Sequence, residues 1–313
     1  MYIGIDLGGT NIAVGLVDET PKVVAKASRP TGATRHYTEI IRDMAEICQE
    51  LMDSNNLTIS DIQGIGVGSP GTTDNKKGEI IYANNLDWHF VPVAEELNKY
   101  FPNVSIAVEN DANAAAFGEY VVNGNDADSF VAVTLGTGVG GGIILNKKIY
   151  TGFNNSGGEI GHFTLVHGGE PCTCGKSGCW ESYASVTALI DQTKKAIAEN
   201  PDSLMIKMAE EEGKVSGRTS FDAAKEGDKA AQAVVDKYIE YVADGIVSII
   251  NIFQPEVLII GGGISMEGDY LLKPIVEYAK KYVYCKEVTQ TEIKIATLRN
   301  DAGIIGAALA TTI

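Results

Sequence analysis

Apolar-rich runs and amphipathic stretches follow one another along the chain. The runs at 62–67, 104–108 and 257–260 predict buried β-strands. Residues 36–54 carry apolar side chains at helical spacing, and Cys48 is one of them, so Cys48 is expected in the core. Further helices are expected at 111–120, within 185–251, at 270–282 and at 302–310. This mixture of strands and helices predicts an α/β protein.

Two segments of the chain resemble each other, 2–18 and 131–145. Each is a β-rich run, a glycine turn containing a threonine (Thr10 or Thr137), and a second β-rich run. The simplest interpretation is two hairpins whose turns need glycine. The functional alternative is a pair of loops that present backbone N–H groups and a hydroxyl to phosphates. Because each segment opens one half of the chain, the pair indicates a duplicated domain with a ligand held between the copies.

The length and the net charge of the chain limit the number of domains and the kinds of binding partner that are expected. The 313 residues suffice for two domains of ordinary size, and a hydrophobic content of 44% with 35 glycines fits a loop-rich α/β protein. Against 25 basic side chains stand 41 acidic ones, and the net charge of −16 argues against nucleic acid and membrane partners. The chain shows no signal peptide and no membrane span, so we expect a cytoplasmic protein.

A histidine and three cysteines form the most specific chemical pattern, with His162 followed by Cys172, Cys174 and Cys179. One imidazole and three thiolates are the ligands of a closed, structural zinc site. The alternatives are a disulfide or unrelated buried thiols, but three of five cysteines within eight residues argue against chance. Cys285 lies outside the pattern and has no assigned role.

Two common nucleotide-binding signatures are absent. The triplet Gly261, Gly262, Gly263 follows a predicted strand, but Met266 stands where the dinucleotide pattern needs glycine. The Gly-Lys-Ser sequence at 175–177 lacks the first glycine of a P-loop, and no strand precedes it. Phosphates, if bound, are therefore expected at the hairpin turns.

Six motifs together resemble the ROK family of repressors, open reading frames and sugar kinases, and the likeness spans nearly the whole chain. They are Asp6-Leu-Gly-Gly-Thr10, Ser69-Pro-Gly71, Glu109-Asn-Asp-Ala-Asn113, Leu135-Gly-Thr-Gly-Val-Gly-Gly141, Glu159-Ile-Gly-His162 and 172–181. The resemblance implies a two-domain, duplicated actin-like (ribonuclease H-like) ATPase fold with a ligand cleft between the domains. It implies a smaller domain at 1–120, on which a helix at 301–313 packs back. It also implies a larger domain at 121–300 that carries the zinc loop and a dimer interface.

The same resemblance assigns catalysis and nucleotide binding. Taken alone, Asp111 is most simply a helix cap. In the family pattern it is the general base that takes a proton from the 6-hydroxyl of a sugar, while Asp6 lies near Mg²⁺ and the phosphates of ATP. The implied nucleotide-binding residues are Asp6, Gly8, Gly9, Thr10, Asn11, Gly136, Thr137, Gly138, Gly261, Gly262 and Gly263.

Sugar binding is implied in the same way, with glucose as the expected substrate. The implied contacts are Gly71, Asn84, Asn110, Asp111, Glu159, His162 and Glu181. His162 would use one ring nitrogen for zinc and the other for a sugar hydroxyl. Mannose, fructose, allose or an N-acetylated aminosugar remain alternative substrates. A sugar-responsive ROK repressor is a further alternative, but such repressors carry a DNA-binding domain before the first strand, and here that strand starts at Tyr2. A homodimer is expected.

Overall fold

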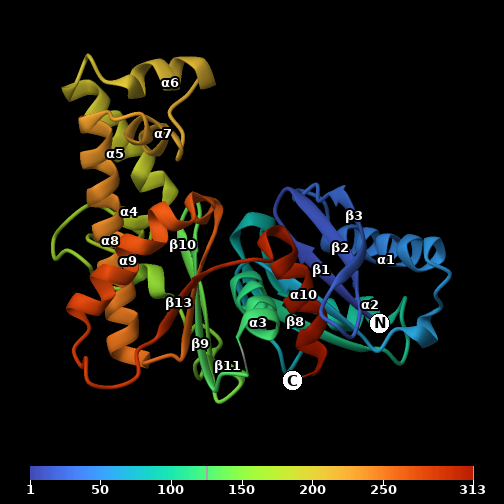
Figure 1. Cartoon of the computed structure of the whole chain (residues 1–313). Coiled ribbons are helices and arrows are strands. Elements are labelled where there is room, and N and C mark those ends of the chain that lie inside the picture. The colour runs from blue at the N-terminus through green and yellow to red at the C-terminus, as the bar shows by residue number, and fades with distance from the viewer. Residues whose placement is uncertain (125, 313) are drawn as a thin grey trace. The chain divides into compact units, whose positions relative to one another are not determined.

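A computed structural model describes residues 1–124 and 126–312 as a mixed α/β protein, which confirms the predicted fold class (Figure 1). The chain forms two compact units. Unit 1 contains Met1–Ala132, Gly142–Gly158 and the described residues from Thr297 onward. Unit 2 contains Val133–Gly141 and Glu159–Ala296. Ile313, the last residue of the helical segment expected at 301–313, lies outside the described residues.

Unit 1 is built on a five-stranded sheet of order β3-β2-β1-β4-β8. Strand β2 is antiparallel to its neighbours β1 and β3, whereas β4 is parallel to both β1 and β8. The strands are β1 (Tyr2–Leu7), β2 (Asn11–Val17), β3 (Val23–Pro30), β4 (Gly64–Ser69) and β8 (Ser105–Asn110). The first predicted hairpin is therefore confirmed, and its glycine turn joins β1 to β2.

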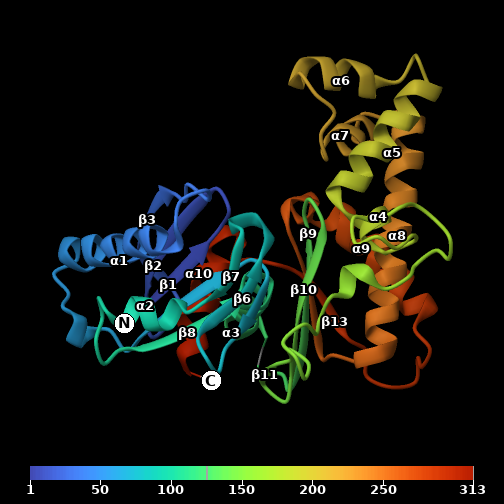
Figure 2. The same cartoon turned by 180° about the vertical axis from the view of Figure 1, so that it is seen from behind.

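A small antiparallel sheet of order β5-β6-β7 lies next to α2 in unit 1 (Figure 2). Its strands are β5 (Thr72–Asp74), β6 (Glu79–Ala83) and β7 (Trp88–Val91), and α2 is Val93–Asn98. The 3-10 turn Asn84–Leu86, which carries Asn84, connects β6 to β7.

The second large sheet has the order β11-β10-β9-β12-β13. Its strands are β9 (Ser129–Leu135), β10 (Val139–Leu145), β11 (Lys148–Ile149), β12 (Val257–Gly261) and β13 (Glu292–Ile295). Strand β12 is parallel to β13, and β10 is antiparallel to β11. This order repeats that of the first sheet, with β9 in the place of β1 and β12 in the place of β4. The repeat agrees with the duplication predicted from the two glycine-containing segments.

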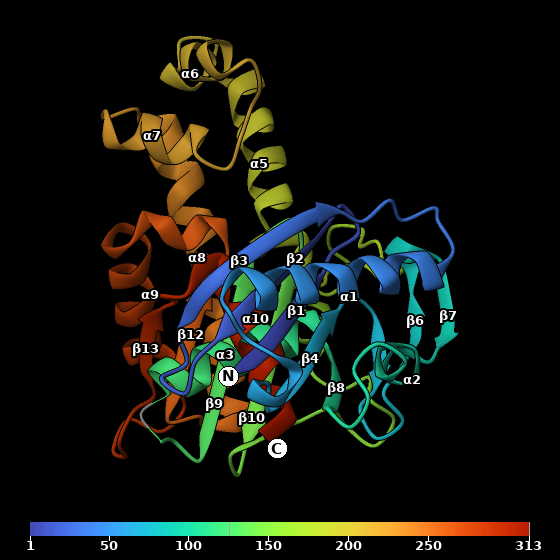
Figure 3. The same cartoon turned by 90° about the vertical axis from the view of Figure 1, so that its right-hand side faces the viewer.

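Unit 2 also contains a group of helices. They are α4 (Glu181–Ala184), α5 (Val186–Glu199), α6 (Leu204–Glu212), α7 (Thr219–Lys225), α8 (Lys229–Phe253) and α9 (Asp269–Tyr282). α8 packs against α5, α7 and α9, and α6 and α7 gather at one end of α5 and α8 (Figure 3). The other short 3-10 turns of the chain are Ile59–Asp61, Ile160–His162, Gly263–Glu267, Arg299–Asp301 and Ala310–Thr312.

The two faces of the first sheet are covered in different ways. Helix α1 (Tyr37–Ser54) crosses one face, and its buried side chains, Cys48 included, pack with the fully buried Ile3 and Ile5 of β1 (Figure 3). This confirms that Cys48 belongs to the core. On the opposite face α10 (Ala302–Leu309) packs on β1 and β4 and on α3 (Asp111–Asn123).

Glycines allow this second layer to approach the sheet closely. A β-carbon on Gly4 or Gly66, in β1 and β4, would collide with a backbone carbonyl oxygen of α10. Between the two helices, a β-carbon on Gly306 would collide with the carbonyl oxygen of Ala114. Backbone therefore contacts backbone, and there is no room for another methyl group.

Among the described residues, no helix is long and apolar enough to cross a membrane.

The close contact of α3 with α10 makes a stability prediction. Alanine normally favours a helix over glycine by about 1 kcal/mol. We expect Gly306→Ala to do the opposite and to lower the free energy of unfolding by about 1–3 kcal/mol, because its methyl group is forced into the Ala114 carbonyl. Urea unfolding followed by circular dichroism measures this. Gly263→Ala is the matched control, since its added methyl meets no atom within 4 Å. A Gly306→Ala protein as stable as the wild type would contradict the close contact.

Candidate active site and metal centre

The first glycine turn, Gly8-Gly9-Thr10, joins β1 to β2 and is held from inside the protein. The Gly8 N–H donates to the carbonyl oxygen of Asn11 at 2.9 Å. The hydroxyl of Thr31 donates to the Gly8 carbonyl at 2.6 Å, and the Thr31 N–H donates to the Thr10 carbonyl at 2.8 Å. Thr31 is fully buried, whereas the side chains of Thr10 and Asn11 are exposed. The predicted phosphate-binding side chains therefore stand on a fixed turn.

Helix α3 begins at Asp111, but its cap is Asn110. The Asn110 side-chain oxygen accepts the N–H groups of Ala112 at 2.9 Å and Asn113 at 3.1 Å, and its amide nitrogen donates to the Gly71 carbonyl at 2.9 Å. The capping role considered for Asp111 from the sequence alone therefore belongs to the preceding residue. Asp111 is the first helical residue, and its carboxylate is free of that structural task.

Two acids of unit 1 influence each other electrostatically. The side chain of Asp111 is open to solvent, but the surrounding protein reduces its hydration, and this raises its pKa despite the hydrogen bond from the Ala112 N–H. Burial, together with the charge of Asp111, raises the pKa of Asp6 to about 6. The pair is therefore a site where a cation would be favourable.

A third acid, the buried Glu109, stabilises the start of α3 by hydrogen bonds. Its side chain is only 2% exposed. The carboxylate accepts the Asn110 N–H at 2.8 Å, the Asn113 side-chain amide at 3.0 Å and the side-chain amide of Asn75. Burial raises the pKa of Glu109 against these hydrogen bonds. Glu109 thus fixes the backbone that presents Asn110 and Asp111.

The remaining sugar contacts predicted in unit 1 lie on turns. Gly71 has φ +90°, and a β-carbon there would collide with the carbonyl oxygen of Tyr82. Only glycine fits this position without strain. Asn84 is exposed, and its side-chain oxygen accepts the Tyr82 hydroxyl at 3.0 Å.

The second glycine turn, Gly136-Thr137-Gly138 in unit 2, is anchored to the start of α5. The Val186 N–H donates to the Gly136 carbonyl at 2.8 Å, and the Thr187 hydroxyl donates to the Thr137 carbonyl at 2.7 Å. The side chain of Thr137 is exposed.

Glu181, at the start of α4, lies between this turn and the cysteine cluster. Its carboxylate accepts the Val139 N–H at 3.0 Å, and a β-carbon on Gly138 would collide with it. Its other oxygen lies 3.8 Å from the Cys172 sulfur. Glu181 therefore connects a predicted nucleotide turn with the predicted metal site.

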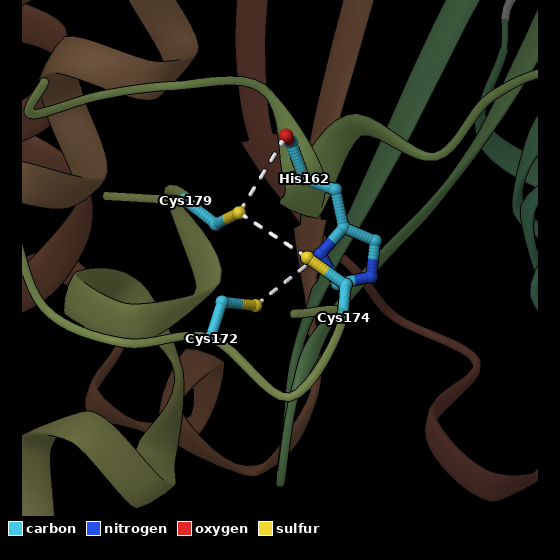
Figure 4. Close-up of side chains that lie close together, drawn as sticks. All are labelled: His162, Cys172, Cys174 and Cys179. Carbon is cyan, nitrogen blue, oxygen red and sulfur yellow. Dashed lines mark hydrogen bonds between the residues drawn. The ribbon is translucent and has the colours of Figure 1, made fainter. Parts of the chain in front are cut away.

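His162, Cys172, Cys174 and Cys179 come together in space (Figure 4), with their ligand atoms all within 4.8 Å of one another. The His162 Nδ1 lies 3.6 Å from the Cys172 sulfur, and the Cys174 and Cys179 sulfurs are 3.6 Å apart. A disulfide would need about 2 Å. Tetrahedral zinc, with bonds of about 2.0–2.3 Å, separates its ligand atoms by roughly 3.5–3.8 Å. The cluster therefore fits a zinc ion, with Nδ1 of His162 as the ligand atom.

The acidity of the thiols also suits a metal. Burial acts against it, but hydrogen bonds from the Cys174 N–H and from the Cys174 and Cys179 thiols lower the pKa of Cys172 to about 7. Burial, together with the neighbouring Cys174 and Cys172, raises the pKa of Cys179 to about 12. One thiolate is thus ready near neutral pH, and an incoming cation would favour ionisation of the others.

Trp180 anchors this loop in the interior of unit 2. Its ring is fully buried and stacks on Phe163, which follows His162, with ring centroids 5.3 Å apart. Its indole N–H donates to the Tyr241 carbonyl of α8 at 2.8 Å, and Gly245 of α8 leaves room for the ring. Because Trp180 stands between Cys179 and Glu181 in the chain, it fixes a predicted metal ligand and a predicted sugar contact together.

The glycine triplet predicted for the adenosine side follows β12. Gly261 is the last residue of the strand, and Gly262 has φ +87° with a β-carbon position blocked by the Leu135 carbonyl. Gly263 opens the next 3-10 turn, and the Ser265 hydroxyl donates to the Gly262 carbonyl at 2.7 Å.

The predicted residues fall into one group in each unit. Unit 1 holds Asp6, Gly8, Gly9, Thr10, Asn11, Gly71, Asn84, Asn110 and Asp111. Unit 2 holds Gly136, Thr137, Gly138, Glu159, His162, Cys172, Cys174, Cys179, Glu181, Gly261, Gly262 and Gly263. Glu159 is exposed and immediately precedes the 3-10 turn that carries His162. Sequence reasoning assigned no role to the supporting residues Thr31, Glu109, Trp180 and Thr187. Glu109 and Trp180 lie within recognised motifs, whereas Thr31 and Thr187 do not.

Known proteins resemble this chain over nearly its full length. It is 36% identical to a glucokinase of Halalkalibacterium halodurans, over 97% of this chain and 93% of that protein. It is 38% identical to a glucokinase of Thermotoga maritima, over 98% of this chain and 95% of that one.

Among solved structures, a ROK family glucokinase from Streptomyces griseus in complex with glucose and AMPPNP superimposes with a TM-score of 0.79. The two are 31% identical, and the match covers 98% of this chain and 97% of that chain. The model of the ROK family itself matches residues 2–312. The chain belongs to the ROK family.

Proposed function

We propose that this chain is an ATP-dependent glucokinase, which transfers the γ-phosphoryl group of ATP to the 6-hydroxyl of glucose. The observation that carries the proposal is Asp111, an exposed carboxylate of raised pKa at the start of α3, where Asn110 and not Asp111 caps the helix. The glucokinases at 36% and 38% identity and the S. griseus complex with glucose and AMPPNP support it.

Asp111 would act as the general base. Its carboxylate takes the proton of the 6-hydroxyl as that oxygen attacks the γ-phosphorus of ATP. The positive end of a helix lowers the basicity of a carboxylate, but here reduced hydration outweighs that effect and raises the pKa. A stronger base suits proton transfer from an alcohol.

Carboxylates and an imidazole would orient the sugar. Glu159, Glu181 and His162 offer acceptors and a ring nitrogen to vicinal hydroxyls, and the further sugar contacts implied by the family resemblance are Asn110, Asn84 and Gly71. In this structure one oxygen of Glu181 accepts the Val139 N–H. Its other oxygen could then accept a sugar hydroxyl without loss of that anchor.

Phosphate binding would fall to the two glycine turns. Thr10 and Thr137 donate hydroxyl groups to phosphate oxygens, and Gly261, Gly262 and Gly263 border the adenosine. Asp6, with Asp111 beside it, provides the hard oxygen ligands that Mg²⁺ prefers. When bound, Mg²⁺ would neutralise charge on the transferring phosphates.

Zinc would be held by His162, Cys172, Cys174 and Cys179 in a structural role, because these residues fill all four positions of a tetrahedron. It would fix the loop that carries Glu159, His162 and Glu181. We further infer that the protein is cytoplasmic. We also infer that it forms a homodimer through unit 2, and size-exclusion chromatography with light scattering would test this oligomeric state.

The test of the activity is a coupled assay of ATP consumption across glucose, mannose, fructose, allose and N-acetylated aminosugars. Glucose should give the highest kcat/KM. If another sugar gave the highest kcat/KM, the proposed phosphoryl transfer from ATP would stand, but that sugar and not glucose would be the substrate. No turnover with any sugar would overturn the proposal.

The first prediction of this assignment concerns the base. Asp111→Asn should lower kcat by about 10²–10⁴, the usual contribution of general base catalysis, while glucose still binds and the fold is kept. Steady-state kinetics and calorimetric titration of glucose measure both effects. Asp202→Asn, which changes an exposed acid of the α5–α6 connection, is the control. Near-normal kcat in Asp111→Asn would reject the assignment.

The second prediction follows from the raised pKa of Asp6. Folding disfavours its ionised form, so the wild type loses stability as pH rises through about 6. Asp6→Asn should therefore melt at a higher temperature than the wild type at pH 8, with a gain that shrinks as pH falls through 6 toward 3.8, and should lose activity with Mg²⁺ and ATP. Melting curves from pH 8 to pH 5 check this. A stability change independent of pH would refute the electrostatic explanation.

The third prediction concerns zinc. Elemental analysis should find about one zinc per chain. Cys174→Ser should lose it and mainly lower kcat/KM for glucose, since displacement of positioning residues by ~1 Å can cost on the order of 10²-fold. The affinity for ATP should change far less. Cys285→Ser, outside the cluster, should behave as the wild type. Equal weakening of nucleotide and sugar binding in folded Cys174→Ser would mean that the zinc supports the whole unit instead.

A further inference from the structure

The two glycine turns are held by the same kind of contact, although their surroundings differ. We propose that Thr31 and Thr187 are positioning residues that orient the turns for phosphate binding by engaging their carbonyl groups. The inference rests on the proposed function, because it takes the turns to bind the phosphates of ATP. Neither threonine belongs to the motifs of the sequence, and each acts through a turn without contributing its own side chain to the ligand.

In unit 1 the contact is made from the core. Thr31 directly follows β3 and is fully buried. Its hydroxyl donates to the Gly8 carbonyl at 2.6 Å and its N–H to the Thr10 carbonyl at 2.8 Å. Two carbonyls of one three-residue turn are thereby bound to a single buried residue.

Thr31 is itself fixed by charged side chains. The Arg35 guanidinium donates to the Thr31 carbonyl at 2.6 Å and to the carboxylate of Asp43 at 2.7 Å. Asp43 lies on α1 and is only 6% exposed. A chain of hydrogen bonds therefore runs from a helix of the core to the turn, which makes Thr31 a rigid support.

In unit 2 two neighbouring residues share the same task. The Val186 N–H donates to the Gly136 carbonyl at 2.8 Å, and the Thr187 hydroxyl donates to the Thr137 carbonyl at 2.7 Å. Both donors belong to the first turn of α5. As in unit 1, one N–H group and one threonine hydroxyl donate hydrogen bonds to two carbonyl oxygens of the turn.

The electrostatics of the peptide group explain why this matters for an anion. A carbonyl oxygen repels a phosphate, whereas a backbone N–H attracts it. Glycine turns can adopt many conformations, and some of them point carbonyls outward. A turn whose carbonyls are already bound to protein donors keeps its N–H groups for the ligand, so less ordering is needed when ATP binds.

A purely structural role predicts something different. Loss of a buried hydrogen bond lowers stability and, through it, all activities alike. Positioning of the turns predicts a selective effect on the nucleotide, with binding of glucose unchanged. The two roles are therefore separated by comparing the two substrates.

The experiment uses threonine-to-valine changes, which remove the hydroxyl and keep the shape. Thr31→Val and Thr187→Val should each lower kcat/KM for ATP about 3- to 10-fold, the change expected from one hydrogen bond of ordinary net strength. Affinity for AMPPNP, measured by calorimetry, should fall by a similar factor. Affinity for glucose without nucleotide should stay within about twofold. Thr31→Ser and Thr187→Ser keep the hydroxyl and should restore most of the loss.

Thr193→Val is the matched control, because Thr193 is fully buried and its hydroxyl donates to the Leu189 carbonyl within α5. It should leave kcat/KM for ATP unchanged. Thr187 is exposed, so Thr187→Val keeps the test valid if Thr31→Val does not fold.

The outcomes separate this inference from the function on which it rests. Wild-type protein that turns over glucose, with both valine variants equally active, would overturn only the role of the threonines. So would an equal loss of glucose and AMPPNP affinity. A wild type that neither binds AMPPNP nor phosphorylates a hexose would overturn the proposed function and this inference with it.

Discussion

Close packing of backbone on backbone is the constraint on which unit 1 depends. Helix α10 can lie directly on β1 and β4 because Gly4 and Gly66 present no side chain to it, and it meets α3 through Gly306. This stack sets the distance between the end of β1, where Asp6 stands, and the start of α3, where Asp111 stands. The charge of Asp111 then helps to raise the pKa of Asp6. The chemistry proposed for these acids is thus a consequence of the glycines in the layer behind them.

Buried carboxylates complete the support of α3. Glu109 accepts N–H groups at the start of the helix. Further along, Glu119 is 4% exposed and accepts the Leu298 N–H at 2.8 Å and the side-chain amide of Asn123 at 2.6 Å. Each buried charge is compensated by donors, as a stable fold requires. Glu119 thereby ties α3 to the segment that leads into α10, so the helix is held by acids near both of its ends as well as by glycine contacts.

The sequence predicted features that depend on local pattern. The hairpin at Gly8 to Thr10, the helix containing Cys48 and the cluster of Cys172 with His162 all follow from spacing and residue type, and the structure contains them. The sequence also indicated the duplication that the strand order shows, because segments with the same glycine turn occur twice in the sequence.

Features that depend on distant contacts escaped prediction. The strand expected at 62–67 is Gly64–Ser69, since Ile62 ends a 3-10 turn and pairing with β8 extends as far as Ser69. The cap of α3 is Asn110, because Asn110 also reaches Gly71 on another turn. Thr31 gave no signal in the sequence, because the turn carbonyls that it binds, those of Gly8 and Thr10, lie more than twenty residues away in the chain.

Trp180 shows how such a distant contact can join two chemical tasks. Its ring packs against Gly245 of α8, donates a hydrogen bond to the Tyr241 carbonyl and stacks on Phe163. The residues before and after it are therefore held together. Cys179 turns toward the metal cluster, and Glu181 turns toward the Gly138 turn. A metal at the cluster would bind three cysteines of this loop and His162 of the preceding 3-10 turn, so the loop would then be fixed from both its apolar and its polar side. Glu159 and Glu181, the acids proposed to orient a sugar, can therefore be partly or fully exposed and still be ordered, because the buried ring and the metal ligands would supply that order before the sugar binds.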